Sequence, residues 1–394
     1  MSDTSDPPLM AACVARYGSP LYVYDAQAVR DAFCRFRAAF PYQPTECHYA
    51  IVCNKNAYLV RLLQALDAGI HANTPGDAYA ALAIGVPADR IVYSGTNLTR
   101  PDFDYLIANG IRLNLDSLDQ LRDLARQGGA REAGLRLLID DEDRPNRIGV
   151  TPAELEAAVG IARNGSLRLT GLHMYSGTNT LRASRFLAGL DRLIAASARL
   201  PDLEYVDLGG GFGVAYRHGQ PPLDLQRIGA EVTLRMEALS AERGRRVRLL
   251  LEPGRTVVAA AGTLLVTVVS VKERGGRRYV GVDSTVGNIV VESVYHPFHR
   301  IEAVAPRGGD LDIPTDVCGN TTHSRDFLAR SSRLPTLHPG DLLALRDVGA
   351  YGYAMSSHFL NRPRPAEVVV DGGETYLTTR RETFDDLLAT RVSD

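Results

Sequence analysis

A pattern that repeats eight times between about residues 45 and 265 constrains the fold most. Each repeat begins with a short apolar run typical of a strand and continues into a helical or loop segment. Such alternation predicts parallel strands, and eight units favour a closed (β/α)8 TIM barrel. A doubly wound sheet is less favoured, because no GxGxxG sequence opens a helix near the start. The runs are HYAIVC, GIHAN, RIVYSG, IRLNLD, LRLLID, LTGLHMYSG, YVDLGGG and VRLLLEPG.

A second, mostly β part is expected after the barrel. From about residue 265 the sequence alternates between apolar and polar residues and turns at two Gly-Gly pairs, as hairpins do. The early segment PLYVYD also has strand character and is a candidate to join this β part. The expected fold class is α/β, with an N-terminal strand (1–27) joining the β domain, a barrel (28–264) and a C-terminal β domain (265–394).

Charge and cysteine content argue against several functions. The 44 basic and 46 acidic residues give a formal net charge of −2, so global charge does not favour nucleic acid or an anionic membrane. Five cysteines without a CxxC pair indicate neither a disulfide framework nor a zinc site. No targeting segment or run of 18 apolar residues is found. We expect a soluble, cytoplasmic protein that binds a small molecule and no metal.

Two glycine-containing motifs follow expected strands, where barrels place their ligands. The motif GGGFG (209–213) has three glycines, which let backbone N–H groups approach an anion such as phosphate. A tight turn that needs positive φ is an equally good interpretation. The motif EPGR (252–255) ends the run VRLLL, which places Glu252 and Arg255 at the barrel mouth. Isolated Glu–Arg pairs are more commonly surface ion pairs.

Other polar residues also follow strands. His173 and Tyr175 share one face of the run LTGLHMY, because strand side chains alternate with period two. Thr178 comes next, in the segment SGTN. A buried histidine is more often structural than catalytic. Tyr351, held among glycines, is either a ligand contact or a packed turn, and the segment 322–326 is either a site or a solvated loop.

The motifs GGGFG, EPGR and GAYGYAMSSHFLNRPRPAEV, in this order, resemble those of the fold-type III, pyridoxal-phosphate-dependent decarboxylases. The resemblance runs from PLYVYD to the end of the chain. It is strongest to the diaminopimelate decarboxylases, with ornithine and arginine decarboxylases as relatives. It implies an alanine racemase-like barrel followed by a β domain, a lyase activity in amino acid metabolism, and an active site at a homodimer interface.

The resemblance also implies pyridoxal 5′-phosphate as cofactor and a role for each matching residue. Thr178 and Tyr351 match residues that help a glycine-rich cradle to hold the phosphate. Glu252 matches the acid that keeps the pyridine nitrogen protonated, so that the ring can accept electrons. Asp326 and Arg255 are implied substrate contacts. The implied cofactor-binding residues are His173, Tyr175, Thr178, Gly210, Gly211, Glu252, Gly254, Arg255 and Tyr351.

Around the reacting carbon the sequence departs from the family. Val52, in the run YAIVCN, stands where the family motif YAVKAN has the lysine that forms the Schiff base. Tyr175 replaces a histidine that stacks on the cofactor ring. Thr322 and His323 replace a Cys-Glu pair, and Val291 stands where a substrate-binding arginine is expected. These changes suggest a changed substrate or a changed reaction.

Lys55 is a candidate for a displaced Schiff-base lysine. It lies three positions after Val52, and the only other lysine is Lys272 in the β part. A desolvated amine can be deprotonated near neutral pH, whereas a guanidinium cannot. Strand alternation puts Val52 and Lys55 on opposite faces, so a turn after Asn54 is needed. The alternative is a solvated loop residue. The candidate catalytic residues are Lys55, Thr322 and His323.

Three functions fit the sequence. The first is an enzyme that binds pyridoxal phosphate and acts on an amino acid or a derivative of one. The second is a non-catalytic binding or regulatory relative, which the missing lysine favours. The third is a different reaction at the same site, such as racemisation. Glu252 favours the first function, because a non-catalytic protein needs no acid beside the pyridine nitrogen of the cofactor. We also expect a homodimer, in which Tyr351 completes a site across the interface.

Overall fold

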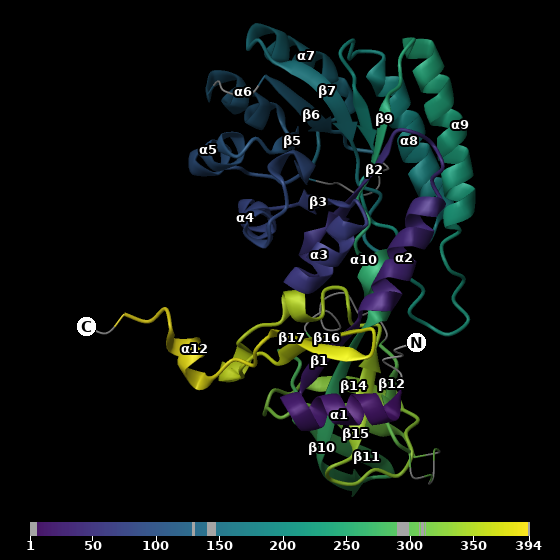
Figure 1. Ribbon diagram of the computed structural model, residues 1–394, viewed down its shortest axis with the longest axis vertical. Helices are drawn as coiled ribbons and strands as arrows, with labels where there is room; N and C mark the ends of the chain where they lie inside the picture. Colours follow the sequence, from purple (N-terminus) through teal and green to yellow (C-terminus); the bar gives the residue numbers. More distant parts are fainter. Residues whose placement is uncertain are drawn as a thin grey trace.

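The computed structural model describes residues 6–127, 131–139, 147–289, 299–306, 308, 311 and 313–392. Within them, eight parallel strands close into a barrel in chain order. Figure 1 shows this barrel above a second sheet. Each strand comes from one of the eight apolar runs, so the predicted barrel is confirmed. The strands are β2 (Thr45–Ala50), β3 (Gly69–Ala72), β4 (Ile91–Tyr93), β5 (Arg112–Leu115), β6 (Glu132–Arg136), β7 (Arg168–His173), β8 (Tyr205–Asp207) and β9 (Arg248–Leu251).

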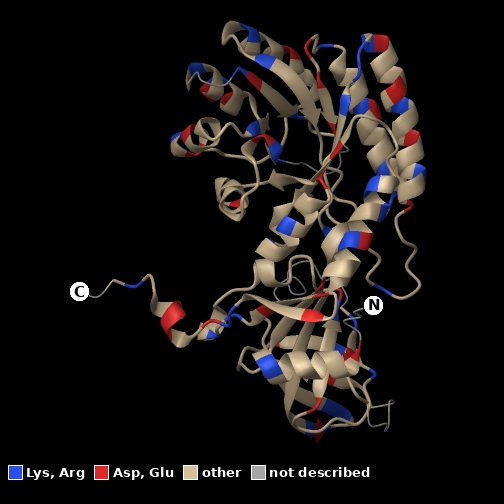
Figure 2. Ribbon diagram, in the orientation of Figure 1, with Lys and Arg blue, Asp and Glu red and all other residues tan. Residues whose placement is uncertain are grey.

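Helices cover the outside of the barrel. Their apolar residues pack on the strands, and Figure 2 shows acidic and basic residues interspersed along the outer surface, for example on α9. Local sequence sets the helix ends: Thr74 and Asp77 form a capping box at the start of α4, and Gly85 ends it with φ 102°. The helices are α2 (Ala26–Ala38), α3 (Ala57–Ala65), α4 (Pro75–Ile84), α5 (Arg100–Ala108), α6 (Leu118–Gln127), α7 (Leu155–Asn164), α8 (Ala183–Ser197), α9 (Leu225–Arg243) and the short α10 (Arg255–Val258).

The second sheet has nine strands and includes an early one. β1 pairs antiparallel with β10 and parallel with β16, so the segment PLYVYD does join the C-terminal sheet. β10 begins at Gly262 and crosses the boundary expected after residue 264. Both Gly-Gly pairs turn hairpins with positive φ. The strands are β1 (Leu21–Asp25), β10 (Gly262–Arg274), β11 (Arg277–Val282), β12 (Ile301–Ala303), β13 (Thr315–Cys318), β14 (Phe327–Ser332), β15 (Leu342–Arg346), β16 (Ala366–Asp371) and β17 (Glu374–Thr379).

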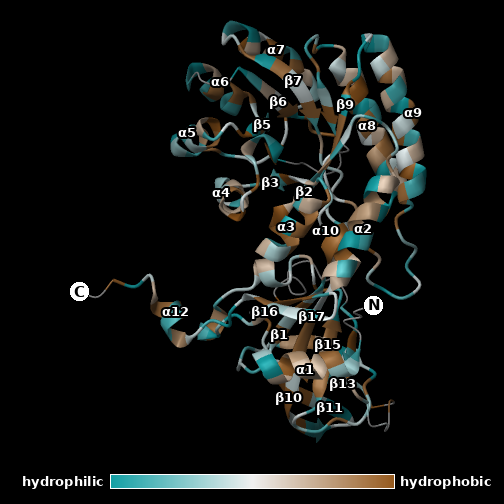
Figure 3. Cartoon of the chain, in the orientation of Figure 1, coloured by the Kyte–Doolittle hydropathy of each residue, from teal (hydrophilic) through white to brown (hydrophobic). Residues whose placement is uncertain are grey.

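One apolar core runs from the barrel into the facing side of the sheet. It includes barrel residues such as Tyr49 and sheet residues such as Tyr22 and Val266. A smaller core lies on the other side of the sheet, beneath helix α1 (Pro7–Tyr17). Figure 3 shows the apolar strands enclosed by more polar helix surfaces, with helix α12 (Phe384–Leu388) extending from the body. The shared core holds the β domain against the barrel mouth.

Among the described residues, no helix is both long enough and apolar enough to cross a lipid bilayer.

Candidate active site

A cavity lies at the carboxyl ends of the barrel strands, between the barrel and residues of the β domain. All nine residues that the sequence suggested for cofactor binding line it, together with Val52. These residues come from segments up to 299 positions apart, because closure of the barrel brings the strand ends together and the β domain adds Tyr351. The remaining lining residues are Ala50, Cys53, His71, Asn73, Arg136, Ile148, Asn179 and Phe212.

The glycine motif after β8 is both a strained turn and part of the cavity wall. Gly209 and Gly211 have φ of 66° and 94°, which favour glycine. A Cβ atom would lie 1.9 Å from the Met174 carbonyl oxygen at position 209, and 2.2 Å from the Gly177 oxygen at position 211. Gly210 and Gly211 line the cavity without side chains. This wall therefore leaves backbone groups accessible to an anionic ligand.

A cation lies beside the glycine motif. The buried Arg255 donates a hydrogen bond of 2.7 Å from Nη1 to the Tyr216 hydroxyl group, and its guanidinium carbon lies 4.6 Å from the centre of the Tyr351 ring. Tyr351 has φ of 64°, and its N–H donates to the Cys53 carbonyl oxygen over 2.8 Å. Arginine and backbone N–H groups are typical phosphate ligands. The charge and the glycine wall thus fit a phosphate group.

The position of Tyr351 corrects one expectation. Tyr351 was expected to complete a site across a dimer interface, but it lines the cavity of its own chain. The reason is the hydrogen bond to Cys53, which fixes the β domain against the same chain's β2–α3 loop. Tyr351 therefore gives no argument for a dimer.

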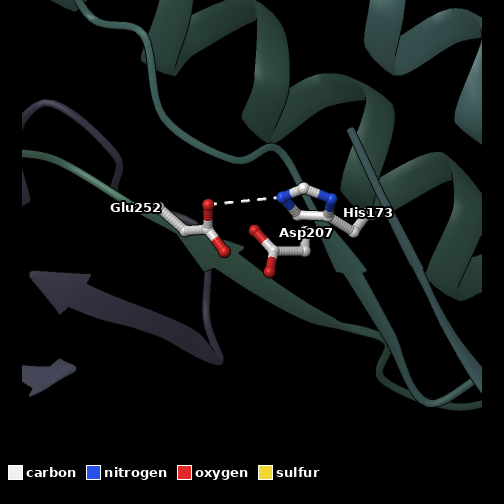
Figure 4. Close-up of side chains that lie close together, drawn as sticks. All are labelled: His173, Asp207 and Glu252. Carbon is white, nitrogen blue, oxygen red and sulfur yellow. Dashed lines mark hydrogen bonds and ion pairs between the residues drawn. The ribbon is translucent and has the colours of Figure 1, made fainter. Parts of the chain in front are cut away.

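Glu252 lies at the base of the cavity among other buried polar groups. Figure 4 shows Glu252 with His173 and Asp207, whose polar atoms lie within 4.8 Å of one another. Glu252 Oε2 lies 3.3 Å from His173 Nε2, whereas Oε1 has no hydrogen-bond partner among the described residues. Asp207 accepts from the Gly209 N–H at 2.9 Å and from Asn114 Nδ2 at 3.4 Å. Both Asp207 oxygens are thus engaged, while Glu252 Oε1 and His173 Nδ1 have no hydrogen-bond partner among the described residues.

Burial shifts the pKa values of this network toward neutral forms. Desolvation raises the pKa of Glu252 to about 8 and that of Asp207 to about 7, where the charge of Glu252 adds to the rise. Desolvation lowers the pKa of His173 to about 4. A buried carboxyl group with a free oxygen is suited to pair with a ligand nitrogen that carries a proton. The orphaned oxygen therefore fits the pyridine nitrogen of a pyridoxal group.

Arg136 and His71 were not among the residues that the sequence analysis selected, yet both line the cavity. Arg136, at the end of β6, lies 5.4 Å from the centre of the Tyr175 ring, and the Tyr175 hydroxyl group is 3.0 Å from Thr178 Oγ1. His71 lies at the end of β3. Both residues have charged or titratable side chains near the carboxyl end of a strand, where barrels place their active sites. This position in the sequence could have identified them.

Val52 occupies the cavity, and Lys55 does not. β2 ends at Ala50, and Ile51–Cys53 forms a 3-10 turn, so the strand alternation applied to Val52 and Lys55 was wrong. The Val52 side chain lines the cavity and is 36% exposed. Lys55 is exposed and absent from the cavity lining. Burial raises the pKa of Glu367 on strand β16, and the positive charge of Lys55 partly opposes this rise. The role suggested for Lys55 stays a prediction that this placement does not favour.

Apart from Tyr351, the candidates from the β domain do not line the cavity. Thr322 and His323 are exposed, and the His323 ring packs edge-on against Phe359 at 5.3 Å. The buried Asp326 accepts hydrogen bonds from Thr285 and from the Val286 and Thr321 N–H groups, which hold its own loop. Their suggested catalytic and substrate roles stay predictions. Val291 lies outside the described residues.

Comparison with known proteins agrees with this geometry. A family model described as "Pyridoxal-dependent decarboxylase, pyridoxal binding domain" matches residues 26–259. Diaminopimelate decarboxylase of Methanothermobacter thermautotrophicus is 33% identical over 94% of this chain and 91% of its own length. The corresponding protein of Pseudomonas fluorescens is 33% identical over 96% and 94%.

A solved structure gives the same result. Diaminopimelate decarboxylase from Helicobacter pylori, complexed with L-lysine, is 26% identical with a TM-score of 0.88, covering 96% of this chain and 98% of that one. Fold, cavity and sequence therefore agree that this chain belongs to the pyridoxal-dependent decarboxylase family and resembles its diaminopimelate decarboxylases.

Proposed function

We propose that the cavity binds pyridoxal 5′-phosphate and that the protein uses it on an amino acid or an amino-acid-derived substrate. The observation that carries the proposal is that Glu252 Oε1, which has no hydrogen-bond partner among the described residues, lines the same cavity as a glycine wall and a buried arginine. When bound, this cofactor accepts electrons from a bond broken at the substrate's α-carbon. Family membership supports the cofactor, and the diaminopimelate decarboxylase relatives favour a diamino acid or similar substrate.

Each residue of the chain has a separate task in this proposal. Arg255, Gly210 and Gly211 would bind the phosphate, with Thr178 and Tyr351 beside them. Glu252 would hold a proton between its carboxyl group and the ring nitrogen. The aromatic ring of Tyr175 would cover the cofactor where the family has a histidine. The β domain over the barrel mouth excludes water from these groups, which strengthens their electrostatic interactions.

The valine at position 52 gives the site its atypical character. No lysine lines the cavity among the described residues, which supports a site without a covalent link between the chain and the cofactor. We propose that the phosphate and ring contacts alone retain the cofactor, and that the substrate supplies the amine. The specific alternative is a non-catalytic binding protein, favoured by the same valine. A non-decarboxylating reaction at the same cavity is a third outcome.

We further propose a homodimer in which Thr322 and His323 face the cavity of the partner subunit. Both side chains are exposed and lie away from their own cavity. Their replacement of the family's Cys-Glu pair then accounts for a changed substrate preference.

The test is calorimetric titration with pyridoxal 5′-phosphate and pyridoxamine 5′-phosphate, followed by an assay for carbon dioxide release from diamino acids. We expect dissociation constants in the micromolar range or tighter, about −8 kcal/mol. Binding without turnover of any amino acid would support the non-catalytic alternative. No binding of either compound would exclude the enzyme.

A further inference from the structure

His71 is a buried residue of the cavity that has no role in the proposal so far. It lies at the end of β3, where its backbone pairs with Ala50, two positions before Val52. Its side chain is 7% exposed, and neither ring nitrogen has a hydrogen-bond partner among the described residues. Buried polar atoms are rarely left unpaired in native proteins, so each such atom on a cavity wall calls for a partner.

The nearest polar group to His71 is Glu252. The His71 Nε2 atom lies 3.4 Å from Glu252 Oε1, while the His173 Nε2 atom lies 3.3 Å from Oε2. The two imidazole rings are nearly parallel, with centres 6.4 Å apart and planes inclined by 23°. The carboxyl group of Glu252 is therefore contacted by a different histidine on each oxygen.

The groups around His71 come from several barrel strands. Burial is the largest cause that lowers the pKa of His71, and the charge of Arg136 on β6 lowers it further. His173 on β7 and His48 on β2 also face it. Glu252 and, beyond it, Asp207 on β8 are the acidic groups of the network. Because burial raises the pKa of Glu252 to about 8 and lowers that of both His71 and His173, a proton in this network is held by the carboxyl group rather than by an imidazole.

We infer that His71 is a positioning residue that donates its Nε2–H to one lone pair of Glu252 Oε1, leaving the other lone pair for a ligand nitrogen, and thereby sets the charge that Glu252 presents to that nitrogen. The inference rests on the proposed cofactor site and goes beyond it. Without this donor, the Glu252 carboxylate loses a hydrogen bond that stabilises its charged form. Glu252 then keeps its proton to higher pH, and a ligand that pairs with the protonated network binds over a wider alkaline range.

Three variants of the full-length protein test this inference. His71→Leu removes the donor, and His71→Gln keeps an N–H group with a reach close to that of Nε2 but without a titratable ring. His299→Asn is the matched control, because His299 is also buried but is not part of the cavity lining. The dissociation constant of pyridoxamine 5′-phosphate is measured by calorimetry from pH 5.5 to 9.5. This ligand needs no covalent link, so the readout does not depend on turnover.

For wild type we expect affinity to fall as pH rises through about 8, the pKa of Glu252. In His71→Leu the midpoint of this fall should rise by about one pH unit, which increases affinity relative to wild type about twofold at the wild-type midpoint and about eightfold at pH 9.5. His71→Gln should restore most of the wild-type midpoint, and His299→Asn should not move it. An unchanged midpoint in His71→Leu would overturn the inference and leave the cofactor site intact. Absence of binding to wild type would overturn both.

Discussion

Tyr351 and Cys53 are joined by a backbone hydrogen bond of 2.8 Å that links the β domain to the loop after the first barrel strand. The bond places the Tyr351 ring over Arg255 and seals one side of the cavity. Val52, which lines the cavity, immediately precedes this anchor. The hydrogen bond therefore holds the side of the cavity that contains Arg255 next to the loop that carries Val52.

Removal of the Arg255 guanidinium should weaken cofactor binding. Arg255→Ala is expected to raise the dissociation constant of pyridoxal 5′-phosphate about ten- to hundredfold, since a hydrogen bond to a charged group contributes ~1.5–3 kcal/mol. Tyr351→Phe keeps the ring over Arg255 and should weaken cofactor binding less than Arg255→Ala does. Arg122→Ala, on the surface of α6, is the control. Equal affinities for Arg255→Ala and wild type in calorimetry would exclude Arg255 as a phosphate ligand.

Val52→Lys should restore a covalent attachment point. Position 52 lines the cavity, so a lysine there can reach a ligand aldehyde. After incubation with pyridoxal 5′-phosphate and borohydride reduction, peptide mapping should find the label on residue 52 in the variant. Wild type should carry no label in the cavity, and Lys55→Arg should not change its cofactor affinity. A labelled Lys55 peptide in wild type would instead establish the displaced lysine.

Glu252→Gln should stabilise the ligand-free protein at alkaline pH while weakening cofactor binding. Burial raises the folded-state pKa of Glu252 from 4.5 to about 8. The stability that the neutral Glu252 carboxyl group contributes to the folded state is therefore fully present below pH 4.5 and is lost as pH rises through 8. Urea unfolding at pH 9 should show a gain of ~2 kcal/mol for the variant, and the gain should vanish near pH 4. A gain that does not depend on pH would show that ionisation is not its cause.

Gly209→Ala should destabilise the fold more than a substitution at a similar backbone angle elsewhere. A Cβ at Gly209 would lie 1.9 Å from the Met174 carbonyl oxygen, whereas Gly219, with φ 78°, has no atom within 4 Å of such a Cβ. We expect the free energy of unfolding to fall by ~3 kcal/mol for Gly209→Ala, where the backbone must shift. For Gly219→Ala we expect a fall of ~1 kcal/mol, from the left-handed conformation alone. Thermal unfolding of both variants gives the comparison; similar losses would mean that the turn tolerates a side chain.

The protein should be a homodimer in solution. Light scattering is expected to give about twice the chain mass of 42.8 kDa, with an interface of more than ~2,000 Å². If Thr322 and His323 serve the partner's cavity, His323→Ala should alter substrate preference without changing cofactor affinity. A monomer that still binds the cofactor would contradict both expectations.

The barrel and the second sheet could be predicted from the sequence because their signals are local. A strand's apolar run, a helix's period and a Gly-Gly turn each occupy a few neighbouring residues. Their number and order then leave few architectures open. The glycine wall, Glu252 and Arg255 were found for the same reason, since each belongs to a short motif at the end of a strand.

Only the tertiary structure decided how those motifs meet. His71, Arg136 and Asp207 belong to no motif, and they join Glu252 because barrel closure brings the ends of β3, β6, β8 and β9 together. The 3-10 turn at Ile51–Cys53, which strand periodicity did not predict, ends the strand alternation before Lys55, and Lys55 does not line the cavity. Tyr351 entered its own chain's cavity through a backbone bond to Cys53 that side-chain patterns do not encode. Contacts between distant segments depend on packing of the whole chain, and that is why the polar network at the base of the cavity is a property of the folded protein alone.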